Sequence, residues 1–412
     1  MIKDVKARKI FDSRGDATIE VDIVTHGGFG KASAPSGASR GRWEAEPYPA
    51  GGVEQAVRKV LEAVAPEIIG LNSEEQEKVD RILHEVDGTD KFSNLGGNTA
   101  CAISLAASQA AASSKGIPLF QHLSTALAYE IPHPLGNVVG GGKHAKGAKT
   151  DIQEFLVLPV QADSFLEAAE ANVMVHREVG KLLESTGYLA GGKGDEGAWT
   201  SNLETEKIIE LVSKSCEVVS GETGVDVRMG LDMAASTLWS EKDKVYNYER
   251  DRRRLDEGQQ IDFVSKLVEK YKLAYVEDPF HEEAFEAFAE LTKKSKGSLI
   301  CGDDLFVTNL KRLRRGIEHG AANSIIIKPN QVGTLTDAHK AAKAAAEAGF
   351  VTVMSHRSGD VCEPYIAHLA IAFRCPILKT GVVGGERIAK INELIRIEEV
   401  LGERAELACI KL

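Results

Sequence analysis

The sequence predicts an α/β protein in which a small α+β domain precedes a larger domain of alternating strands and helices. Two observations support this fold class. Roughly the first third of the chain has strand-like and then helix-like patterns. The remainder repeats short apolar runs, each ending in a polar or charged residue, with helical segments between them. The chain has 412 residues, which favours two domains over one.

The first domain is expected to open with two strands, VKARKIFDSRG and ATIEVDIVTHGG, the second of which alternates from Thr18 to Ile23. A loop rich in small residues follows. Helices are then predicted over 53–70, with apolar residues at Val57, Val60, Leu61 and Val64, and over the alanine-rich residues 98–115. The second helix should stop at Gly116-Ile117-Pro118.

ALAYEIPHPLGN carries two prolines and reads as the connection between the domains. The predicted domains are therefore residues 1–128 and 129–412. Beyond the connection, the apolar runs are DVRMGLDMA, KLAYVEDPF, GSLICGDDLF, NSIIIKPN, FVTVMSHRSG and CPILKTG. After Asp232 their charged ends recur roughly every 25 residues, the length of one strand-plus-helix unit. If these strands are parallel and close into a barrel, the charged ends converge on one rim.

Composition excludes several classes of function. The formal net charge of −11 argues against nonspecific binding to nucleic acid or to an anionic membrane. No apolar run is long enough to span a bilayer, and the N-terminal segment lacks a signal-peptide core. The six cysteines are scattered without a Cys-x-x-Cys pair, which indicates a reducing compartment. A cytoplasmic location is therefore expected.

Three acids on separate strands suggest a metal site. Asp232, Glu277 and Asp303 each follow an apolar run, and no histidine or thiolate is matched to them. Hard carboxylate ligands suit Mg²⁺ and do not suit Zn²⁺. Taken singly, each acid is more often a solvated strand end. Three in register on one rim would repel one another strongly unless a cation lay among them.

Two lysines point to proton abstraction. In NSIIIKPNQVG, a fully apolar strand ends in Lys328, and the strand of CPILKTG contains Lys379. A lone lysine here usually marks only where a strand reaches water. Near each other and a cation, however, one of the two should have a lowered pKa and supply a neutral amine near pH 7. A neutral lysine beside Mg²⁺ can remove a proton alpha to a carboxylate.

Three further segments carry polar groups. Ser355-His356-Arg357-Ser358 offers an arginine fork and a hydroxyl that could hold a phosphate, although His356 alone would more often be a core residue. GGKGDEGAW lacks the phosphate-loop pattern, so Glu196 is a candidate acid instead. Glu154 in QEF adds a second carboxylate. Two carboxylates would also suit a glycosidase, but that reading leaves both lysines and the acid triad unexplained.

Together these motifs resemble the enolase family, of the archaeal kind. DSRG, PSGAS, QEF, GDEG, EDPF, GDDLFVTN, NQVGTL, SHRSG and KTG occur in the family's order over nearly the whole chain. The resemblance implies an α+β N-terminal domain followed by an eight-stranded, TIM-like α/β barrel of the enolase type. It also implies dehydration of 2-phospho-D-glycerate to phosphoenolpyruvate in glycolysis and gluconeogenesis, with two Mg²⁺ ions, the second arriving with substrate.

The same resemblance assigns roles to individual residues. Lys328 resembles the base and Glu196 the acid, with Glu154 in support and Lys379 beside the substrate carboxylate. His356, His144 and Gln153 correspond to groups around the substrate, and Arg357 and Ser358 to phosphate ligands. The metal ligands implied are Asp232, Glu277 and Asp303 for the first ion and Ser39 for the second. Enolases are commonly homodimers, some of them assembled further, so a homo-oligomer is expected.

The sequence departs from the family pattern in its loops. Arg40 replaces the usual threonine after PSGAS, Trp199 follows GDEG, and Asp360 to Glu363 differ from the usual acidic stretch. These changes keep a second hypothesis open, a divergent paralogue that uses the same proton abstraction on a related acid. A third, a noncatalytic binding protein, would require the loss of a base, an acid or a metal ligand, and none is lost.

Overall fold

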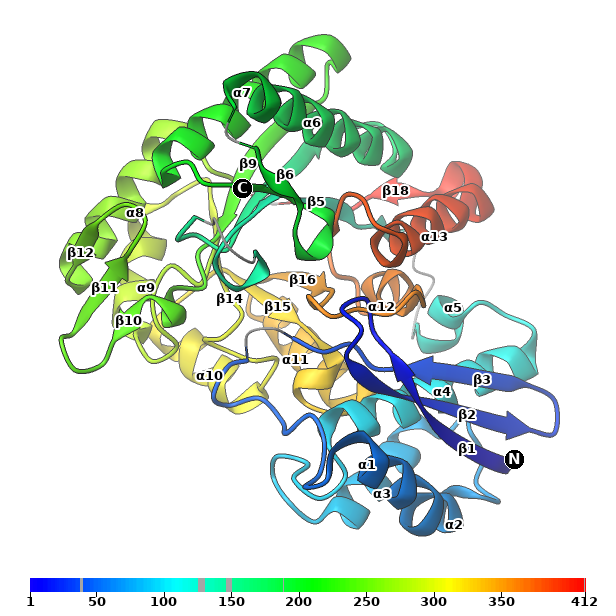
Figure 1. Cartoon of the computed structure of the whole chain (residues 1–412). Helices are drawn as coiled ribbons and strands as arrows, with labels where there is room; N and C mark the ends of the chain where they lie inside the picture. Colours follow the sequence, from blue (N-terminus) through cyan, green and yellow to red (C-terminus); the bar gives the residue numbers. More distant parts are fainter. Residues whose placement is uncertain (38–39, 125–129, 146–149, 188, 411) are drawn as a thin grey trace.

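The computed structural model describes residues 1–37, 40–124, 130–145, 150–187, 189–410 and 412. The chain begins with an antiparallel sheet of β1 (Ile2–Phe11), β2 (Ala17–Thr25) and β3 (Phe29–Ser33). Helix α4 (Gly97–Lys115) lies across this sheet (Figure 1). A Cβ added at Gly30 would stand 2.0 Å from the carbonyl oxygen of Ala106, so the strand needs glycine where α4 passes.

Strand β2 is more buried than its alternation predicted. Glu20 and Asp22 alternate with apolar residues, yet each is only 8% exposed. The guanidinium of Arg8 on β1 pairs with both carboxylates. The long side chain of Arg8 therefore covers the polar face of β2, which the alternating pattern alone would place in solvent.

The helical part of this domain agrees with prediction except at one residue. The predicted helix over 53–70 is a continuous run of α1 (Gly52–Lys59), a π-helical turn (Val60–Val64) and α2 (Ala65–Ile68). The wider turn rotates the following residues, and Leu61 is 44% exposed while Val60 and Val64 are buried. Helix α4 ends at Gly116 in the left-handed conformation, as predicted. The domain is completed by α3 (Gln76–Asp87) and α5 (Leu119–Leu123).

The rest of the chain forms a closed eight-stranded barrel with helices around it (Figure 1). Strand β17 pairs with both β16 and β5, which closes the sheet. The predicted boundary at 128–129 lies outside the described residues and stays a prediction. In order around the barrel, the strands are β5 (His133–Gly140), β6 (Glu154–Gln161), β9 (Asp226–Asp232), β13 (Tyr275–Glu277), β14 (Leu299–Gly302), β15 (Ser324–Ile327), β16 (Val351–Ser355) and β17 (Ile377–Gly381).

One barrel strand contradicts the expectation of uniformly parallel strands. Strand β6 pairs antiparallel with both β5 and β9, whereas the other barrel pairs are parallel. Its start therefore lies at the rim where its neighbours end, and Glu154 pairs with Asp232 in register. The reversal carries Gln153 and Glu154 to the rim that holds the predicted acids and lysines.

In the part of the chain that the structure describes, eight helices follow the strands and cover the barrel, in agreement with the helical segments predicted between the apolar runs. Smaller strands are β4 (Glu130–Ile131), β7 (Leu189–Lys193), β8 (Trp199–Ser201), β10 (Trp239–Ser240), β11 (Val245–Tyr248), β12 (Arg253–Leu255) and β18 (Glu406–Leu407). The helices are α6 (Phe165–Thr186), α7 (Thr205–Thr223), α8 (Glu257–Tyr271), α9 (Phe285–Lys294), α10 (Leu310–His319), α11 (Leu335–Glu347), α12 (Tyr365–Ala372) and α13 (Gly385–Leu401).

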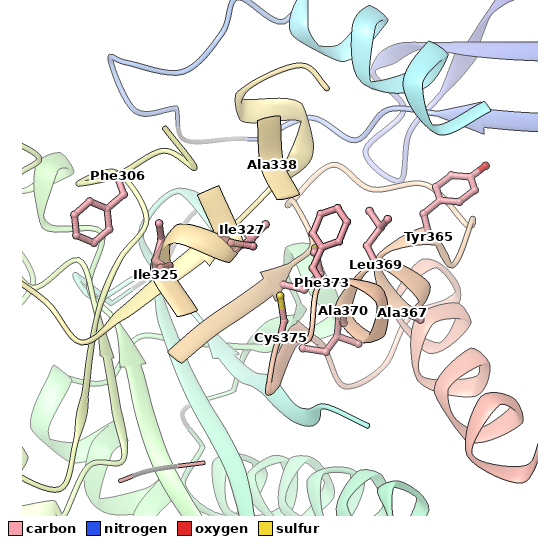
Figure 2. Packing of buried hydrophobic residues seen from close by; sticks show 14 of the residues in the cluster. Phe306, Ile325, Ile327, Ala338, Tyr365, Ala367, Leu369, Ala370, Phe373 and Cys375 are labelled. Atoms are coloured by element: carbon pink, nitrogen blue, oxygen red, sulfur yellow. The ribbon is translucent and has the colours of Figure 1, made fainter. Parts of the chain in front are cut away.

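Strand β15 is covered on both faces, as its unbroken apolar run predicted. Ile326 packs inside the barrel in a cluster with Leu135, Leu156 and Val353. Ile325 and Ile327 belong to the outer core, near Phe306 and Ala338 of the surrounding layer (Figure 2). Because the strand is fully buried up to Ile327, its end is fixed by packing, and Lys328 leaves from a rigid support.

Candidate active site

The predicted site residues converge at one end of the barrel. Asp232 and Glu277 are the last residues of adjacent strands and pair in register. Asp303 and Lys328 directly follow β14 and β15, and Lys379 lies in β17. One pocket is lined by Gly37, His144, Gln153, Glu154, Glu196, Asp232, Asp303, Lys328, Ser355, His356, Arg357, Ser358 and Lys379. Glu277 is not part of this lining, but its carboxylate contacts Lys379, which is. Ser39 lies outside the described residues.

Lys379 is surrounded by carboxylates. Its Nζ lies 2.7 Å from Glu277 Oε2, 2.9 Å from Asp232 Oδ2 and 3.1 Å from Glu154 Oε2. Burial by itself would lower the pKa of Lys379, but Asp232, Glu154 and Glu277 hold it well above its usual value. Lys379 is therefore a fixed cation at the centre of the acid cluster.

Lys328 contacts a single acid, Asp303, through a short Nζ–Oδ2 ion pair. Burial would lower its pKa, but the charge of Asp303 raises it above the ordinary value. The lowering expected beside a cation stays a prediction. The two lysines do face each other's acids, but the attraction of the carboxylates outweighs the repulsion between the ammonium groups.

The acid cluster fits a divalent cation. Burial raises the pKa of Asp232, and burial and Asp232 raise that of Glu277 well above its usual range. Asp303 repels both carboxylates. Glu277 Oε1 is buried and has no hydrogen-bond partner. Three carboxylates on one rim, one with a buried oxygen that makes no hydrogen bond, offer the hard oxygen donors that Mg²⁺ prefers. The residues present thus fit the expected ion.

A second group links histidines and acids beside Lys379. His144 Nδ1 lies 3.1 Å from Glu154 Oε1 and 3.7 Å from Glu196 Oε1. Burial opposes the charge on His144, but Glu196 and Glu154 raise its pKa to about 9. Asn137 Nδ2 donates to Glu196 Oε2 at 2.9 Å. Burial favours the neutral form of Glu196, yet His356 and His144 hold its pKa well below the usual range. The proton of this group therefore rests on His144.

The turn that carries Glu196 is tightly built. Glu196 has a φ of 67°, which is rare for a residue with a side chain. A Cβ at Gly381 would stand 2.1 Å from the Glu196 carbonyl oxygen, and one at Gly197 would stand 2.1 Å from that of Val383. The glycines allow the turn to press against the end of β17, which aims the carboxylate into the pocket.

Arg387, which was not predicted from the sequence, orients the segment that was predicted to hold a phosphate. Its side chain is fully buried on α13. Its guanidinium donates to the carbonyl oxygens of Arg357 at 2.6 Å and Ser358 at 2.7 Å, and to His356 Nδ1 at 2.7 Å. Because Nδ1 accepts that bond, the ring proton is on Nε2, which lies 3.4 Å from Glu196 Oε2. Only the small-residue start of α13, GGER, could have hinted at a buried arginine.

Glu44 was also not predicted. It belongs to the N-terminal domain, and its carboxylate lies at this end of the barrel. It pairs with both terminal nitrogens of Arg357, at 3.0 and 3.2 Å. The two loop changes noted in the sequence are placed differently. Arg40 donates to Glu46 at 3.3 Å and Trp199 Nε1 to the His176 carbonyl oxygen at 2.8 Å, and neither lines the pocket.

A larger surface groove of about 610 Å³ lies elsewhere, between α7, α8 and β12. Its lining includes Arg253, Phe263 and Lys266 but none of the predicted site residues. It lacks the convergent buried acids and bases that mark a catalytic site, so the chemistry belongs to the barrel rim.

Two family models match the chain. Residues 2–123 match the enolase N-terminal domain, and residues 128–412 match the enolase C-terminal TIM barrel domain. Curated enolases align over nearly their full lengths. That of Methanosphaera stadtmanae is 53% identical over 97% of both chains. Those of Methanothermobacter thermautotrophicus and Archaeoglobus fulgidus are 50% and 48% identical over 97% of this chain and 96% and 98% of theirs.

Two further observations bear on the sequence-based expectations. Among the residues that the structure describes, no helix is both long and apolar enough to cross a membrane. All six cysteines are free thiols in the structure. With both family models matched in order and identities near half over almost the whole length, the chain belongs to the enolase family.

Proposed function

We propose that the protein catalyses the reversible, Mg²⁺-dependent dehydration of 2-phospho-D-glycerate to phosphoenolpyruvate and water. One observation carries this proposal: two buried lysines contact the three carboxylates of the acid triad on a single barrel rim. Lys379 touches Asp232 and Glu277, and Lys328 touches Asp303. That combination is what removal of a weakly acidic proton beside a carboxylate requires.

Lys328 is proposed as the base that removes the C2 proton. It follows a strand that is buried on both faces, so its amine is held rigidly. It has one acidic partner, whereas Lys379 has three. Lys379 is suited instead to hold the substrate carboxylate and the negative charge that develops beside it.

Glu196, with His144 and Glu154, is proposed to deliver the proton to the departing C3 hydroxyl. Hydroxide is a poor leaving group, so a positioned acid is needed. Glu196 itself is held as a carboxylate, but the adjacent His144 carries a proton with a pKa of about 9. We propose that these neighbouring side chains act together as the acid, with His356 Nε2 facing Glu196 Oε2 at 3.4 Å.

Arg357 and Ser358 are proposed to bind the phosphate of the substrate. Gln153 is proposed to contact the substrate beside the acid cluster. Gln153 Nε2 lies 3.4 Å from Asp232 Oδ2. Asp232, Glu277 and Asp303 would hold the first Mg²⁺ and Ser39 would contribute to the second. The ions, when bound, would stabilise the dianion formed when the C2 proton leaves.

The alternatives have less support. A divergent paralogue drew its case from Arg40 and Trp199, but both side chains are bonded away from the pocket. A noncatalytic protein would lack a base, acid or ligand, whereas Lys328, Glu196 and the acid triad are present. We further propose a homodimer, which the resemblance to enolases implies. A cytoplasmic location stays a prediction.

The direct test is to add 2-phosphoglycerate to the purified protein and follow the ultraviolet absorbance of the enol product, first with Mg²⁺ and then with EDTA. Turnover on the order of ten per second or more that EDTA abolishes would support the proposal. A folded, Mg²⁺-binding protein without turnover would contradict it and favour the divergent paralogue.

A further inference from the structure

The guanidinium of Arg357 is held by a carboxylate from the other domain. Glu44 Oε2 lies 3.0 Å from Arg357 Nη1, and Glu44 Oε1 lies 3.2 Å from Nη2. The two side chains are only 5% and 4% exposed. A two-point pair between an arginine and a carboxylate fixes the plane of the guanidinium, which a single contact does not. Asn330 Oδ1 adds a third contact to Arg357, at 3.3 Å.

The same carboxylate also binds the loop that leads to it. The backbone N–H of Gly41 donates to Glu44 Oε1 at 3.1 Å, and the N–H of Glu44 donates to the Gly41 carbonyl oxygen at 3.2 Å. The residue after Glu44 attaches the loop to the barrel domain, because the N–H of Ala45 donates to the Gln331 carbonyl oxygen at 2.9 Å. Contacts within its own loop therefore hold Glu44 in place independently of Arg357.

Gln331 connects this pair to the acid cluster. Its Nε2 donates to Asp303 Oδ1 at 2.9 Å and lies 3.4 Å from Glu44 Oε1, while Thr308 Oγ1 donates to its Oε1 at 2.6 Å. Asp303 is the partner of Lys328. A chain of contacts thus runs from the proposed base to the proposed phosphate arginine, so a shift of Arg357 would also shift the phosphate relative to Lys328.

We infer that Glu44 is a positioning residue: from the N-terminal domain it holds Arg357 in the orientation that binds the phosphate of the substrate. The inference rests on the proposed role of Arg357. It gives the first domain a direct part in substrate binding, through a side chain that does not itself touch the substrate. Without Glu44, Arg357 would remain buried but would lose the two-point contact that sets the plane of its guanidinium, and the phosphate would be misplaced.

The test compares Glu44→Gln with Glu46→Gln. Both remove one carboxylate from the same loop, but the Glu46 side chain pairs with Arg40 at 3.3 Å and is not among the residues that line the pocket. For each variant, KM and kcat for 2-phosphoglycerate are measured with the inhibition constant of inorganic phosphate and the melting temperature. Glu44→Gln should raise KM and the phosphate constant together by about tenfold or more, while Glu46→Gln should stay within about twofold of wild type.

Glu44→Asp provides a second variant if the glutamine variant folds poorly. It keeps the charge and is one methylene shorter, so the two-point pair is lost and a smaller change in the same direction is expected. A lower melting temperature with an unchanged phosphate constant in either variant would mean that Glu44 is only structural, and would overturn the inference.

Arg357→Lys separates this inference from the proposed function. If Glu44 acts through Arg357, adding Glu44→Gln to Arg357→Lys should change the phosphate constant little further. Full additivity of the two effects would contradict the inference while leaving Arg357 as a phosphate ligand. A phosphate constant that Arg357→Lys leaves unchanged would instead remove the proposed role of Arg357, and with it the basis for assigning Glu44.

Discussion

At the residue scale, the two lysines of the site differ in the number of acids that they contact. Lys379 lies within 3.1 Å of three carboxylates, and Lys328 is paired with one. Releasing the proton of Lys379 would leave three buried carboxylates without their cation, which is costly. Losing the single partner of Lys328, for example when Asp303 binds Mg²⁺, would remove the main cause of its raised pKa. This asymmetry favours Lys328 as the base.

Lys328→Ala should therefore abolish exchange of the C2 proton of 2-phosphoglycerate with solvent deuterium. Dehydration should fall by about 10²–10⁴-fold, the usual contribution of a positioned base. Exchange is followed by NMR in D₂O, with Lys311→Ala on the exposed surface of α10 as the control. Exchange at the wild-type rate in Lys328→Ala would remove this lysine as the base.

Glu196→Gln should separate the two steps of the reaction. The amide keeps the size of the side chain and can still accept from Asn137, but it no longer stabilises the proton on His144. Proton exchange at C2 should continue, because Lys328 is untouched, while formation of phosphoenolpyruvate should fall by about 10²-fold or more. Parallel loss of exchange and dehydration would contradict the division of labour between base and acid.

At the scale of elements, helix α11 begins on groups supplied by the first domain. Asp80 Oδ2 on α3 accepts the Thr336 backbone N–H at 3.0 Å and its hydroxyl at 2.5 Å, and Ser104 Oγ on α4 accepts the Leu335 N–H at 3.0 Å. These N–H groups are among those that a helix leaves unpaired at its start. Since α11 follows Lys328 within a few residues, the first domain also fixes the segment that carries the base.

Asp80→Ala should lower the free energy of unfolding by about 1–3 kcal/mol, because it removes a buried acceptor from a helix start. Urea denaturation measures this loss, and Glu77→Ala on the exposed side of α3 is the matched control. If both variants lost the same stability, the contact between Asp80 and α11 would have no special weight.

Elements also mark the limit of what the sequence could predict. The apolar runs and their charged ends located β9 and β13 to β17, because burial and chain length leave a clear pattern. The direction of β6 was missed, because an apolar run reads the same for either orientation. Leu61 was missed because one π-helical turn shifts the periodicity. Glu44 and Arg387 were missed because their partners, Arg357 and the His356–Ser358 segment, are hundreds or tens of residues away in sequence.

At the scale of the whole molecule, Mg²⁺ binding should be coupled to stability and to pH. The carboxylates of Asp232 and Glu277 have raised pKa values, through burial and repulsion by neighbouring carboxylates. A cation must displace whatever protons these groups retain, so it competes with protons and binds more weakly as the pH falls. An ion that binds only the folded protein raises the melting temperature, and the increase grows with the logarithm of the ion concentration divided by its dissociation constant.

The increase in melting temperature produced by Mg²⁺ should thus be larger at pH 8 than at pH 6, and EDTA should abolish it at both. The sign follows from the raised pKa values: as pH rises the carboxylates lose their protons, repel one another more strongly in the absence of the ion, and gain more when it binds. Calorimetric titration in buffers of different protonation enthalpy measures the protons released. Glu277→Gln should reduce both the proton release and the thermal shift. A shift that is equal at the two pH values, without proton release, would mean that the triad is already fully ionised and that Lys379 and Lys328 balance its charge.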